Sequence, residues 1–352
     1  MLDYIVVGFG LAGVSFTEQL RKHNKSFIVI SEAVNSSSVV AGGMYNPVIL
    51  KRFTSPWNAL PQLEYAIPFY KAIEHRLQIS VLNPLPVLRV FNAIEEQNNW
   101  LIASDKPLLS PFLSTLFKSN SNKSVLADCN YGEVKQAGRL NVSKLLQTYR
   151  LDLVSSKQYL NKKFDYSAIE FHSDHIIYKN LKTKQIVFAE GYGMLQNPYF
   201  KYLPLNGTKG EVLIIESEEL EVTSIIKSSV FIIPLDEQNH YLVGATYHWT
   251  DKSWESTLEA KEELLSKLNE LINCDYKVVD QLAGIRPTVK DRRPLVGQHP
   301  IHKNLFVLNG MGTRGVMVAP TTSKQLYDFI EDKQELNAEI NCSRFESMYN
   351  EI

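Results

Sequence analysis

Alternating apolar and mixed stretches predict a strand, a helix and a second strand at the start of the chain. Residues 3–7 are a short apolar run, residues 12–23 have helical spacing, and residues 27–32 are a second apolar run. Such a unit is typical of a parallel α/β sheet. Two later segments repeat the pattern: a strand at 186–189 that ends in a glycine turn, and a strand at 305–309 followed by a helix over about 318–330.

The segments between these units have mixed patterning. Helices are predicted at residues 60–77, near 111–118, at 141–150 with Asn141 as the N-cap, and at 257–273. Strands are predicted at 87–94, 100–103, 168–171 and 176–178, and three alternating segments predict an antiparallel sheet at 211–216, 230–234 and 241–246. Residues 281–299 carry Pro287 and Pro294 and are expected to form a loop, and the last twenty residues are expected to be peripheral.

This order predicts a discontinuous arrangement of two α/β domains. A cofactor domain is expected from residues 1–45, 137–205 and 281–352, and a substrate domain that contains the antiparallel sheet from residues 46–136 and 206–280. The chain crosses between the two domains several times, as expected when a sheet domain covers a cofactor domain.

A glycine fingerprint stands between the first strand and the first helix. Gly8 permits the tight turn, Gly10 leaves room for a pyrophosphate, and Gly13 lets the helix pack against the strand. Leu11 and Ala12 begin the helix, and Glu32 lies roughly twenty residues on, where an acid binds a ribose hydroxyl. These features predict a dinucleotide site, and they leave NAD and FAD equally open.

Composition and charge narrow the remaining possibilities. The 352 residues are 44% hydrophobic and 21% charged, with a formal net charge of −1, so no large nucleic-acid footprint is indicated, although a local basic patch stays open. The three cysteines have no metal-ligand spacing, and no metal site is expected. No apolar run has the length of a membrane span and no signal peptide is visible, so a cytoplasmic location without a membrane partner is expected.

Several motifs together resemble the D-amino-acid oxidase/glycine oxidase family of FAD-dependent amine oxidases. They are the fingerprint with Glu32, Ala41-Gly42-Gly43-Met44, Gly244-Ala245-Thr246, Gly284-x-Arg286-Pro287 with Asp291-x-x-Pro294-x-x-Gly297, and Asn309-Gly310-x-Gly312-Thr313-Arg314-Gly315 before Ala319-Pro320. The resemblance implies an α/β fold: a discontinuous Rossmann-type FAD-binding domain plus a mixed α+β substrate domain with an antiparallel sheet. Two strings, Gly43-Met44-Tyr45-Asn46-Pro47 and Gly310–Gly315, also look like the oxidase domain of the bifunctional tRNA wobble-uridine modification enzyme.

The resemblance implies which residues hold the flavin. Gly43 and Met44 would pack against the ring, and Gly191 would form the mid-chain glycine turn. The helix N-terminus that stabilises the reduced flavin would be built from Gly310, Gly312, Thr313, Arg314, Gly315 and Val316. The FAD is expected to be non-covalent, because no cysteine occurs from residue 275 to residue 341.

The resemblance also implies a substrate site. Arg286 would pair with a substrate carboxylate, because a guanidinium donates two parallel hydrogen bonds to one carboxylate. Tyr247 would line the pocket. Lys51 and Arg52 are candidates for a second anionic contact at the mouth, against the alternative of solvated loop charges, and the pair at 292 and 293 is expected on the surface.

Two residues depart from the family pattern. Phe231 stands where glycine oxidases have a tyrosine that helps to hold the carboxylate, which puts free glycine in doubt as the substrate. Glu190 replaces a small residue before Gly191 and is expected to face solvent at the end of its strand.

The predicted activity is oxidation of the C–N bond of a small-molecule amine that carries a carboxylate, an amino acid or N-substituted glycine, by hydride transfer to flavin N5. One alternative is a tRNA-modification oxidase acting on a carboxymethylaminomethyl uridine, which a lysine and arginine stripe beside the pocket would favour. Another is a flavin-binding protein without turnover, which a blocked pocket would favour.

Overall fold

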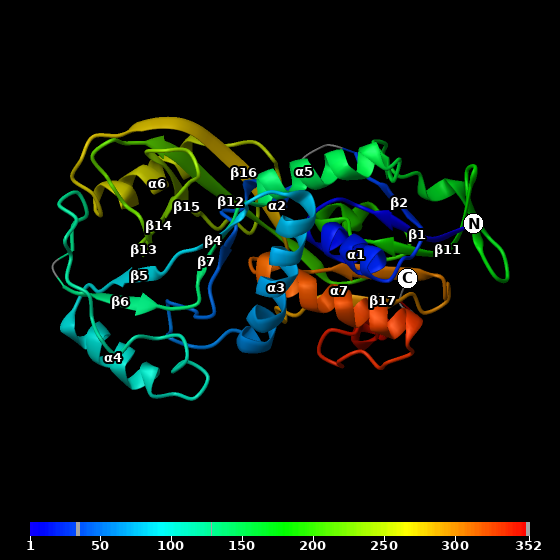
Figure 1. Cartoon of the computed structure of the whole chain (residues 1–352), viewed down its shortest axis with the longest axis horizontal. Helices are drawn as coiled ribbons and strands as arrows, with labels where there is room; N and C mark the ends of the chain where they lie inside the picture. Colours follow the sequence, from blue (N-terminus) through cyan, green and yellow to red (C-terminus); the bar gives the residue numbers. More distant parts are fainter. Residues whose placement is uncertain (33–35, 128, 350–352) are drawn as a thin grey trace.

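The computed structural model of the chain describes residues 1–32, 36–127 and 129–349. It consists of an α/β part that contains both termini and a second part built on a mostly antiparallel sheet (Figure 1). Helices α2 (Ser37–Val40) and α3 (Ala59–Leu77) lie between the two parts in this view. Among the described residues, no helix combines the length and the apolar character needed to span a bilayer.

The α/β part is organised by an eight-stranded sheet. Its central strand β1 (Leu2–Val7) pairs in parallel with β2 (Phe27–Ile30) and β11 (Leu181–Phe188). The remaining strands are β8 (Tyr159–Leu160), β9 (Ile169–Phe171), β10 (Ile176–Tyr178), β17 (Leu295–Gln298) and β18 (Leu305–Asn309). Because β1, β11 and β18 run parallel, their carboxyl ends meet at one edge of the sheet.

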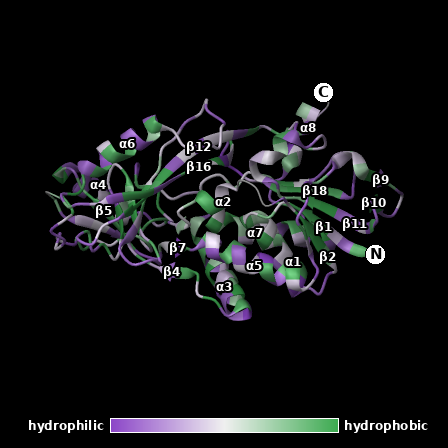
Figure 2. Cartoon of the chain, turned by 90° about the horizontal axis from the view of Figure 1, so that it is seen from above, coloured by the Kyte–Doolittle hydropathy of each residue, from purple (hydrophilic) through white to green (hydrophobic). Residues whose placement is uncertain are grey.

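Both faces of this sheet are buried, which explains its continuous apolar runs. Tyr4 and Val6 of β1 belong to one core cluster, and Ile5 and Val7 belong to another on the opposite face. The helices α1 (Leu11–Lys22), α5 (Val142–Ser155) and α7 (Gly315–Glu331) contribute to the first cluster. Figure 2 shows the strands of this part as predominantly hydrophobic.

The second part is organised by a seven-stranded sheet. Its order is β16 (Lys277–Val289), β12 (Leu205–Glu216), β15 (His240–Gly244), β14 (Phe231–Pro234), β13 (Ile225–Lys227), β5 (Val87–Val90) and β6 (Tyr131–Val134). One face packs on α6 (Leu258–Asn269) through Leu264 and Leu268, which meet Leu213 and Val243 in one core cluster. The alternate residues of these strands, such as Val212 and Leu242, face the other way, toward the α/β part.

Shorter elements complete the chain. They are the three-stranded sheet of β3 (Met44–Tyr45), β7 (Gly138–Leu140) and β4 (Leu82–Pro84), helices α4 (Ile94–Ser104) and α8 (Glu346–Tyr349), and 3-10 turns at Tyr166–Ala168, Gly191–Gln196 and Cys342–Phe345. The predicted cap of α5 is confirmed, since the Asn141 side chain accepts a hydrogen bond from the Lys144 amide.

The structure corrects three predictions of local conformation. Residues 100–103 belong to helix α4, where Trp100 and Ala103 supply its buried face, and residues 111–118 form turns and isolated β-bridges instead of a helix. Residues 281–299 contain most of β16 and all of β17. Pro287 is tolerated within β16 because this strand lies at the edge of its sheet. The last twenty residues are not all peripheral, because Ile340 and Cys342 are buried.

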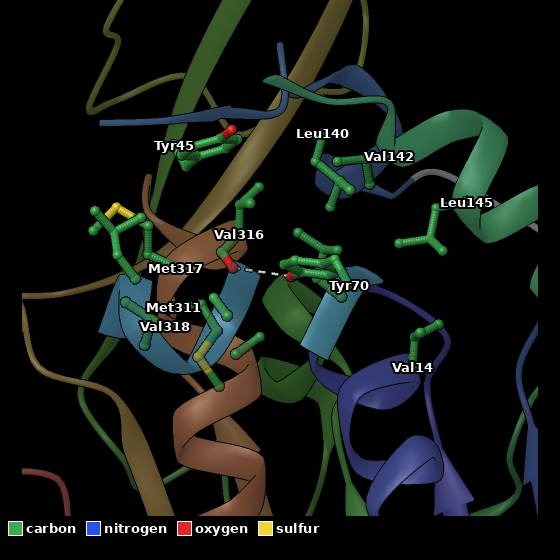
Figure 3. Close-up of a cluster of buried hydrophobic side chains, with 14 of the residues drawn as sticks. Val14, Tyr45, Tyr70, Leu140, Val142, Leu145, Met311, Val316, Met317 and Val318 are labelled. Carbon is green, nitrogen blue, oxygen red and sulfur yellow. Dashed lines mark hydrogen bonds between the residues drawn. The ribbon is translucent and has the colours of Figure 1, made fainter. Parts of the chain in front are cut away.

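Helix α7 begins three residues before its predicted start, which places Pro320 beyond its first turn. A proline cannot donate a hydrogen bond to the carbonyl four residues earlier, which is that of Val316. The buried Tyr70 hydroxyl of α3 donates to this carbonyl at 2.9 Å instead, within the cluster drawn in Figure 3. The first turn of α7 is therefore fixed by a side chain from another helix.

Candidate active site

A cavity of about 1810 Å³ lies between the two sheets and contains almost all of the predicted site residues. It is lined at one end by the turns that follow β1, β11 and β18, and on one side by the seven-stranded sheet. Its size exceeds that of an ordinary small-ligand pocket, which is on the order of 300–1,000 Å³. The space is sufficient for a dinucleotide and a substrate together.

The glycine fingerprint forms the nucleotide end of this cavity. Gly8 has φ +100°, and a Cβ there would lie 2.4 Å from the Ala189 carbonyl oxygen. A Cβ on Gly13 would lie 2.2 Å from the Gly8 carbonyl oxygen, so Gly13 allows the predicted contact of helix with strand without lining the cavity. Glu32 lies two residues beyond β2, lines the cavity and is exposed.

Helix α1 begins at this end with its N-terminus open. Its N-cap is Gly10, which has no side chain to cap the first turn, and the Leu11 amide donates only a long bond of 3.3 Å to the Ser38 hydroxyl. A Cβ on Gly10 would point toward Ser38, at 3.1 Å from its Oγ. The uncapped N-terminus of a twelve-residue helix favours an anion such as a pyrophosphate.

A second uncapped helix N-terminus faces the same cavity. The residues from Gly310 to Val316 line it, and Gly310 and Gly312 have φ of +73° and +57°. Asn309 joins two turns, because it accepts from the Gly310 amide and donates to the Gly191 carbonyl at 2.8 Å. The N-cap residue of α7 is Arg314, whose side chain makes no capping hydrogen bond.

Arg314 has an unsatisfied group inside this turn. Its Nη1 is buried and lacks a hydrogen-bond partner among the described residues, and burial lowers the pKa of the guanidinium. A bound electron-rich ring edge would satisfy both this nitrogen and the open end of α7. The residues present therefore fit a flavin, with the nucleotide at α1 and the ring toward α7.

Gly43 and Met44 lie along the same wall. Gly43 has φ +69°, and a Cβ there would lie 1.9 Å from the Leu140 carbonyl oxygen, so this glycine is required by the contact with β7 as well as by the cavity. The other predicted cofactor residues that line the cavity are Gly8, Gly10, Leu11, Ala12, Glu32, Met44, Gly191, Gly310, Gly312, Thr313, Arg314, Gly315 and Val316.

One face of the seven-stranded sheet roofs the cavity. Cross-strand pairing places Arg286 opposite Thr208, Gly244 opposite both Val212 and Phe231, and Phe231 opposite Lys227. All six residues line the cavity. The roof therefore has an arginine at one end, a lysine at the other, and small or apolar residues between them.

The Arg286 guanidinium lies on this face without a carboxylate partner among the described residues. Its Nη1 donates two long bonds, of 3.4 Å to the Lys209 carbonyl and 3.3 Å to the Thr246 carbonyl, and burial lowers its pKa. A Cβ on Gly210 would lie 2.0 Å from Nη2, so this glycine makes room for the guanidinium. The Tyr247 ring stacks on Arg286 at 4.3 Å and is 56% exposed.

The loop that carries Tyr247 is held by an ion pair between Asp251 and the buried Lys209, which the sequence did not indicate. Lys209 is fully buried and lies 2.5 Å from Asp251 and 3.4 Å from Glu211. Glu211 also accepts from the Thr257 amide at the start of α6. Trp249 and Trp254 of this loop line the cavity mouth.

Cations outnumber acids in the cavity lining, in contrast to the near-neutral chain. Within the described part of the chain, the lining contains three glutamates, Glu32, Glu190 and Glu263, and eleven cations: Lys51, Arg52, Arg150, Lys163, Lys227, Lys252, Lys267, Arg286, Lys290, Arg292 and Arg314. Arg292 was expected only on the surface; it is exposed and also lines the cavity, whereas Arg293 pairs with Glu339 at 2.9 Å.

Glu190 does not face open solvent as expected. Its carboxylate accepts hydrogen bonds from the Tyr166 hydroxyl at 2.5 Å and the Asn197 amide at 2.7 Å. No cation pairs with it among the described residues, and burial raises its pKa to about 7 despite both hydrogen bonds. The strand end thus holds a carboxyl group that titrates near neutral pH.

Comparison with known proteins agrees with this geometry. A family model described as FAD dependent oxidoreductase (DAO) matches residues 3–328. Glycine oxidase from Bacillus subtilis (strain 168) is 28% identical over 149 residues, covering 40% of each chain. The tRNA 5-methylaminomethyl-2-thiouridine biosynthesis bifunctional protein MnmC from Idiomarina loihiensis is 26% identical over 194 residues, covering 51% of this chain and 30% of that protein. The chain thus spans less than half the length of these relatives.

The fold is also similar to that of solved oxidases. The crystal structure of glycine oxidase from Geobacillus kaustophilus superposes with a TM-score of 0.77 at 19% identity, covering 95% of both chains. The two open helix ends and the cavity fit a dinucleotide cofactor, and the family model makes the chain an oxidoreductase. The chain belongs to the DAO family of FAD-dependent oxidoreductases, and it is an enzyme that binds FAD.

Replacing Gly10 with alanine tests the nucleotide end. Gly10 has an extended backbone with φ −98°, and the added methyl meets only the movable Ser38 hydroxyl, so Gly10→Ala should change the free energy of unfolding of the apo-protein by less than about 1 kcal/mol. The methyl would occupy the space above the α1 N-terminus and weaken FAD binding about tenfold or more. FAD titration followed by fluorescence measures this loss. Gly8→Ala is the contrasting variant, because it should destabilise the apo-protein itself, and unchanged FAD affinity of Gly10→Ala would contradict the assignment.

Glu190 should make stability depend on pH. Its folded pKa is about 7 against an ordinary value of 4.5, so the folded state binds the proton more tightly than the unfolded chain. The contribution to the free energy of unfolding is fully present below about pH 4.5, is lost as the pH rises through 7, and amounts to about 3 kcal/mol. Thermal unfolding of FAD-loaded protein between pH 5 and pH 8 should show a flatter profile for Glu190→Gln, whereas Glu218→Gln, at an exposed site, should keep the wild-type profile. Parallel profiles for wild type and Glu190→Gln would be inconsistent with this role.

Proposed function

We propose that the protein oxidises the C–N bond of an amine that carries a carboxylate, an amino acid or an N-substituted glycine. The observation that carries this proposal is the Arg286 guanidinium on the cavity face, which is largely withdrawn from water and has no carboxylate partner among the described residues. A buried guanidinium favours a bidentate carboxylate partner. A substrate carboxylate would supply the missing counter-charge.

The bound FAD supplies the hydride acceptor. Arg286 holds the carboxylate and thereby orients the substrate carbon that loses its hydrogen. Tyr247 covers the guanidinium at 4.3 Å, and Val212, Ile233 and Leu242 give the roof an apolar surface that limits water. The amine must be neutral to react, and the iminium product is hydrolysed by water. No acid–base side chain is required for this scheme.

The same proposal assigns the cofactor contacts. Gly8, Gly10, Leu11 and Ala12 would receive the pyrophosphate, and Glu32 would bind the adenosine ribose. Gly43, Met44, Gly191 and the turn from Gly310 to Val316 would surround the rest of the cofactor. We also propose the division into cofactor and substrate domains given above, and a reducing, cytoplasmic location consistent with the free Cys129, Cys274 and Cys342.

Replacing Arg286 with methionine tests the carboxylate contact. The loss of a charged hydrogen-bonding partner should weaken transition-state binding by about 2–4 kcal/mol, or roughly 30- to 1000-fold in kcat/KM, mainly through KM. Anaerobic bleaching of the flavin by carboxylate-bearing amines measures the effect. Arg292→Met is the matched control, because this side chain is exposed at the cavity mouth, and it should change KM for a small amine by no more than a few-fold. An unchanged KM for Arg286→Met would remove Arg286 from this role.

The cationic lining favours a second candidate, a tRNA-modifying oxidase that acts on a carboxymethylaminomethyl uridine. Phosphate groups require clustered lysines and arginines, and eleven of them line this cavity. The exposed rings of Tyr247 and Trp249, both 56% exposed, offer surfaces on which a base could stack at the mouth. Arg286 would bind the carboxymethyl group in this case too.

The two candidates differ in their response to tRNA and salt. If the second is correct, tRNA bearing carboxymethylaminomethyl uridine should bleach the flavin at least tenfold more efficiently than glycine, and its kcat/KM should fall steeply with salt because counterions compete for the phosphates. Unmodified tRNA is the control and should not bleach the flavin. Equal efficiency for free amino acids, with a weak salt dependence, would exclude the tRNA candidate.

A further inference from the structure

We propose that Lys227 forms a second anion-binding subsite on the roof of the cavity, and that the substrate carries a second anionic group, a carboxylate or a phosphate, remote from the reacting amine. The inference rests on the proposed function, in which Arg286 binds the first carboxylate. It adds a specificity-determining residue at the opposite end of the same sheet face.

The register of the sheet places Lys227 on the same face as Arg286. Lys227 of β13 is opposite Phe231, Phe231 is opposite Gly244, and Gly244 is opposite Val212. Arg286 pairs with Thr208, four residues before Val212 on β12, so side chains at these positions point to one side. Both Lys227 and Arg286 line the cavity.

Lys227 is the unpaired cation of its neighbourhood. Arg89 has Glu96 as its partner, with Nε to Oε1 at 2.9 Å, and Lys267 has Glu263 at 2.5 Å. Among the described residues no carboxylate pairs with Lys227. Its ammonium donates to the Ser229 carbonyl at 3.2 Å and lies 4.6 Å from the centre of the Phe231 ring. These contacts hold the ammonium in place and leave its charge uncompensated.

The electrostatic surroundings agree with this description. Burial, with the positive charges of Arg89 and Lys267, lowers the pKa of Lys227 to about 8. An anion bound against the ammonium would offset the desolvation and restore the pKa toward its ordinary value. The cavity face thus presents a cation whose charged form becomes favourable when a ligand brings an anion.

The spacing of the two cations limits the substrate. Four inter-strand steps and an offset of four residues put the Cα atoms of Arg286 and Lys227 on the order of 20 Å apart. Two cations at such positions cannot share the adjacent carboxylates of an aspartate-sized amine. The second anionic group therefore lies at the end of a tail. Between the two cations, Gly244, Val212 and Phe231 give the roof an apolar surface that the tail can contact.

A series of tailed substrates tests the subsite. N-carboxymethyl amines with tails of equal length would end in a methyl, a carboxylate or a phosphate group, and FAD-loaded enzyme would be assayed by anaerobic flavin bleaching. In the wild type an anionic tail should lower KM about 10- to 100-fold relative to the methyl tail. Lys227→Met should abolish this advantage, Lys227→Arg should retain it, and Lys201→Met, at an exposed position outside the cavity, should behave as wild type. Whichever anionic tail has the lower KM identifies the second group as carboxylate or phosphate.

The wild-type advantage should fade above about pH 8, as the Lys227 ammonium loses its proton. The charged and titratable groups around it are Arg89, Glu96, Glu263, Lys267 and His248, which lies 3.9 Å from Glu263. In the wild type, KM for the anionic tail should therefore rise above about pH 8, whereas in Lys227→Met the KM values of the anionic and methyl tails should stay equal across this range, because the titrating group is absent.

A probe that cannot react separates this inference from the proposed function. A long aliphatic dicarboxylate should bind the FAD-loaded protein in calorimetry, and both Arg286→Met and Lys227→Met should weaken it about tenfold or more. If no amine bleaches the flavin, the proposed activity fails while the probe still tests Lys227. If Lys227→Met leaves both the probe affinity and the tail advantage unchanged, the subsite is overturned.

Discussion

The architecture depends on a close backbone contact at the carboxyl edge of the parallel sheet. Gly8, Gly13 and Ala189 meet there so tightly that a Cβ on either glycine would lie within 2.4 Å of a carbonyl oxygen. This contact sets the direction in which α1 leaves the sheet. Because Gly10 brings no side chain to the cap, the positive end of the helix remains available to a ligand. A larger side chain at Gly8 or Gly13 would close the turn or tilt the helix, and the predicted dinucleotide site would not form.

The second helix end depends on a contact of another kind. Pro320 leaves the Val316 carbonyl without its helical donor, and the Tyr70 hydroxyl replaces that donor from α3. Asn309 ties the preceding turn to Gly191. The turn that we propose to hold the flavin is thus held in place by two separate segments of the chain. Glycine residues can adopt many backbone conformations, so a glycine-rich turn is flexible on its own. These contacts explain how this turn holds a single conformation.

An element of this fold can be predicted from the sequence when its local pattern of residues fits only one type of secondary structure. The strand, turn and helix around Gly8 follow from local rules, and β18 has the predicted bounds. The apolar run around Trp100 fits a strand or a helix, and only its packing decides for α4. The prolines near β16 read as loop signals because edge position is a property of the folded sheet. No sequence pattern pairs Glu190 with Tyr166, or with Asn197 at the other end of the turn that follows it, so the surroundings of its carboxylate were visible only in the structure.

The two faces of the seven-stranded sheet differ in whether their positively charged side chains have carboxylate partners. This contrast supports a functional interpretation of the cavity face. Lys209, on the face toward α6, is fully buried with Asp251 and Glu211 beside it. The opposite face of the sheet, toward the cavity, carries Arg286 and Lys227. Neither of them has a carboxylate partner among the described residues. A buried cation without a partner destabilises a fold. Lys209, which has only a structural role, has two carboxylate partners. The charges left open toward the cavity are therefore best explained by counter-charges that arrive with a ligand. The ligand that we propose carries a carboxylate near the flavin and a second anionic group some distance away.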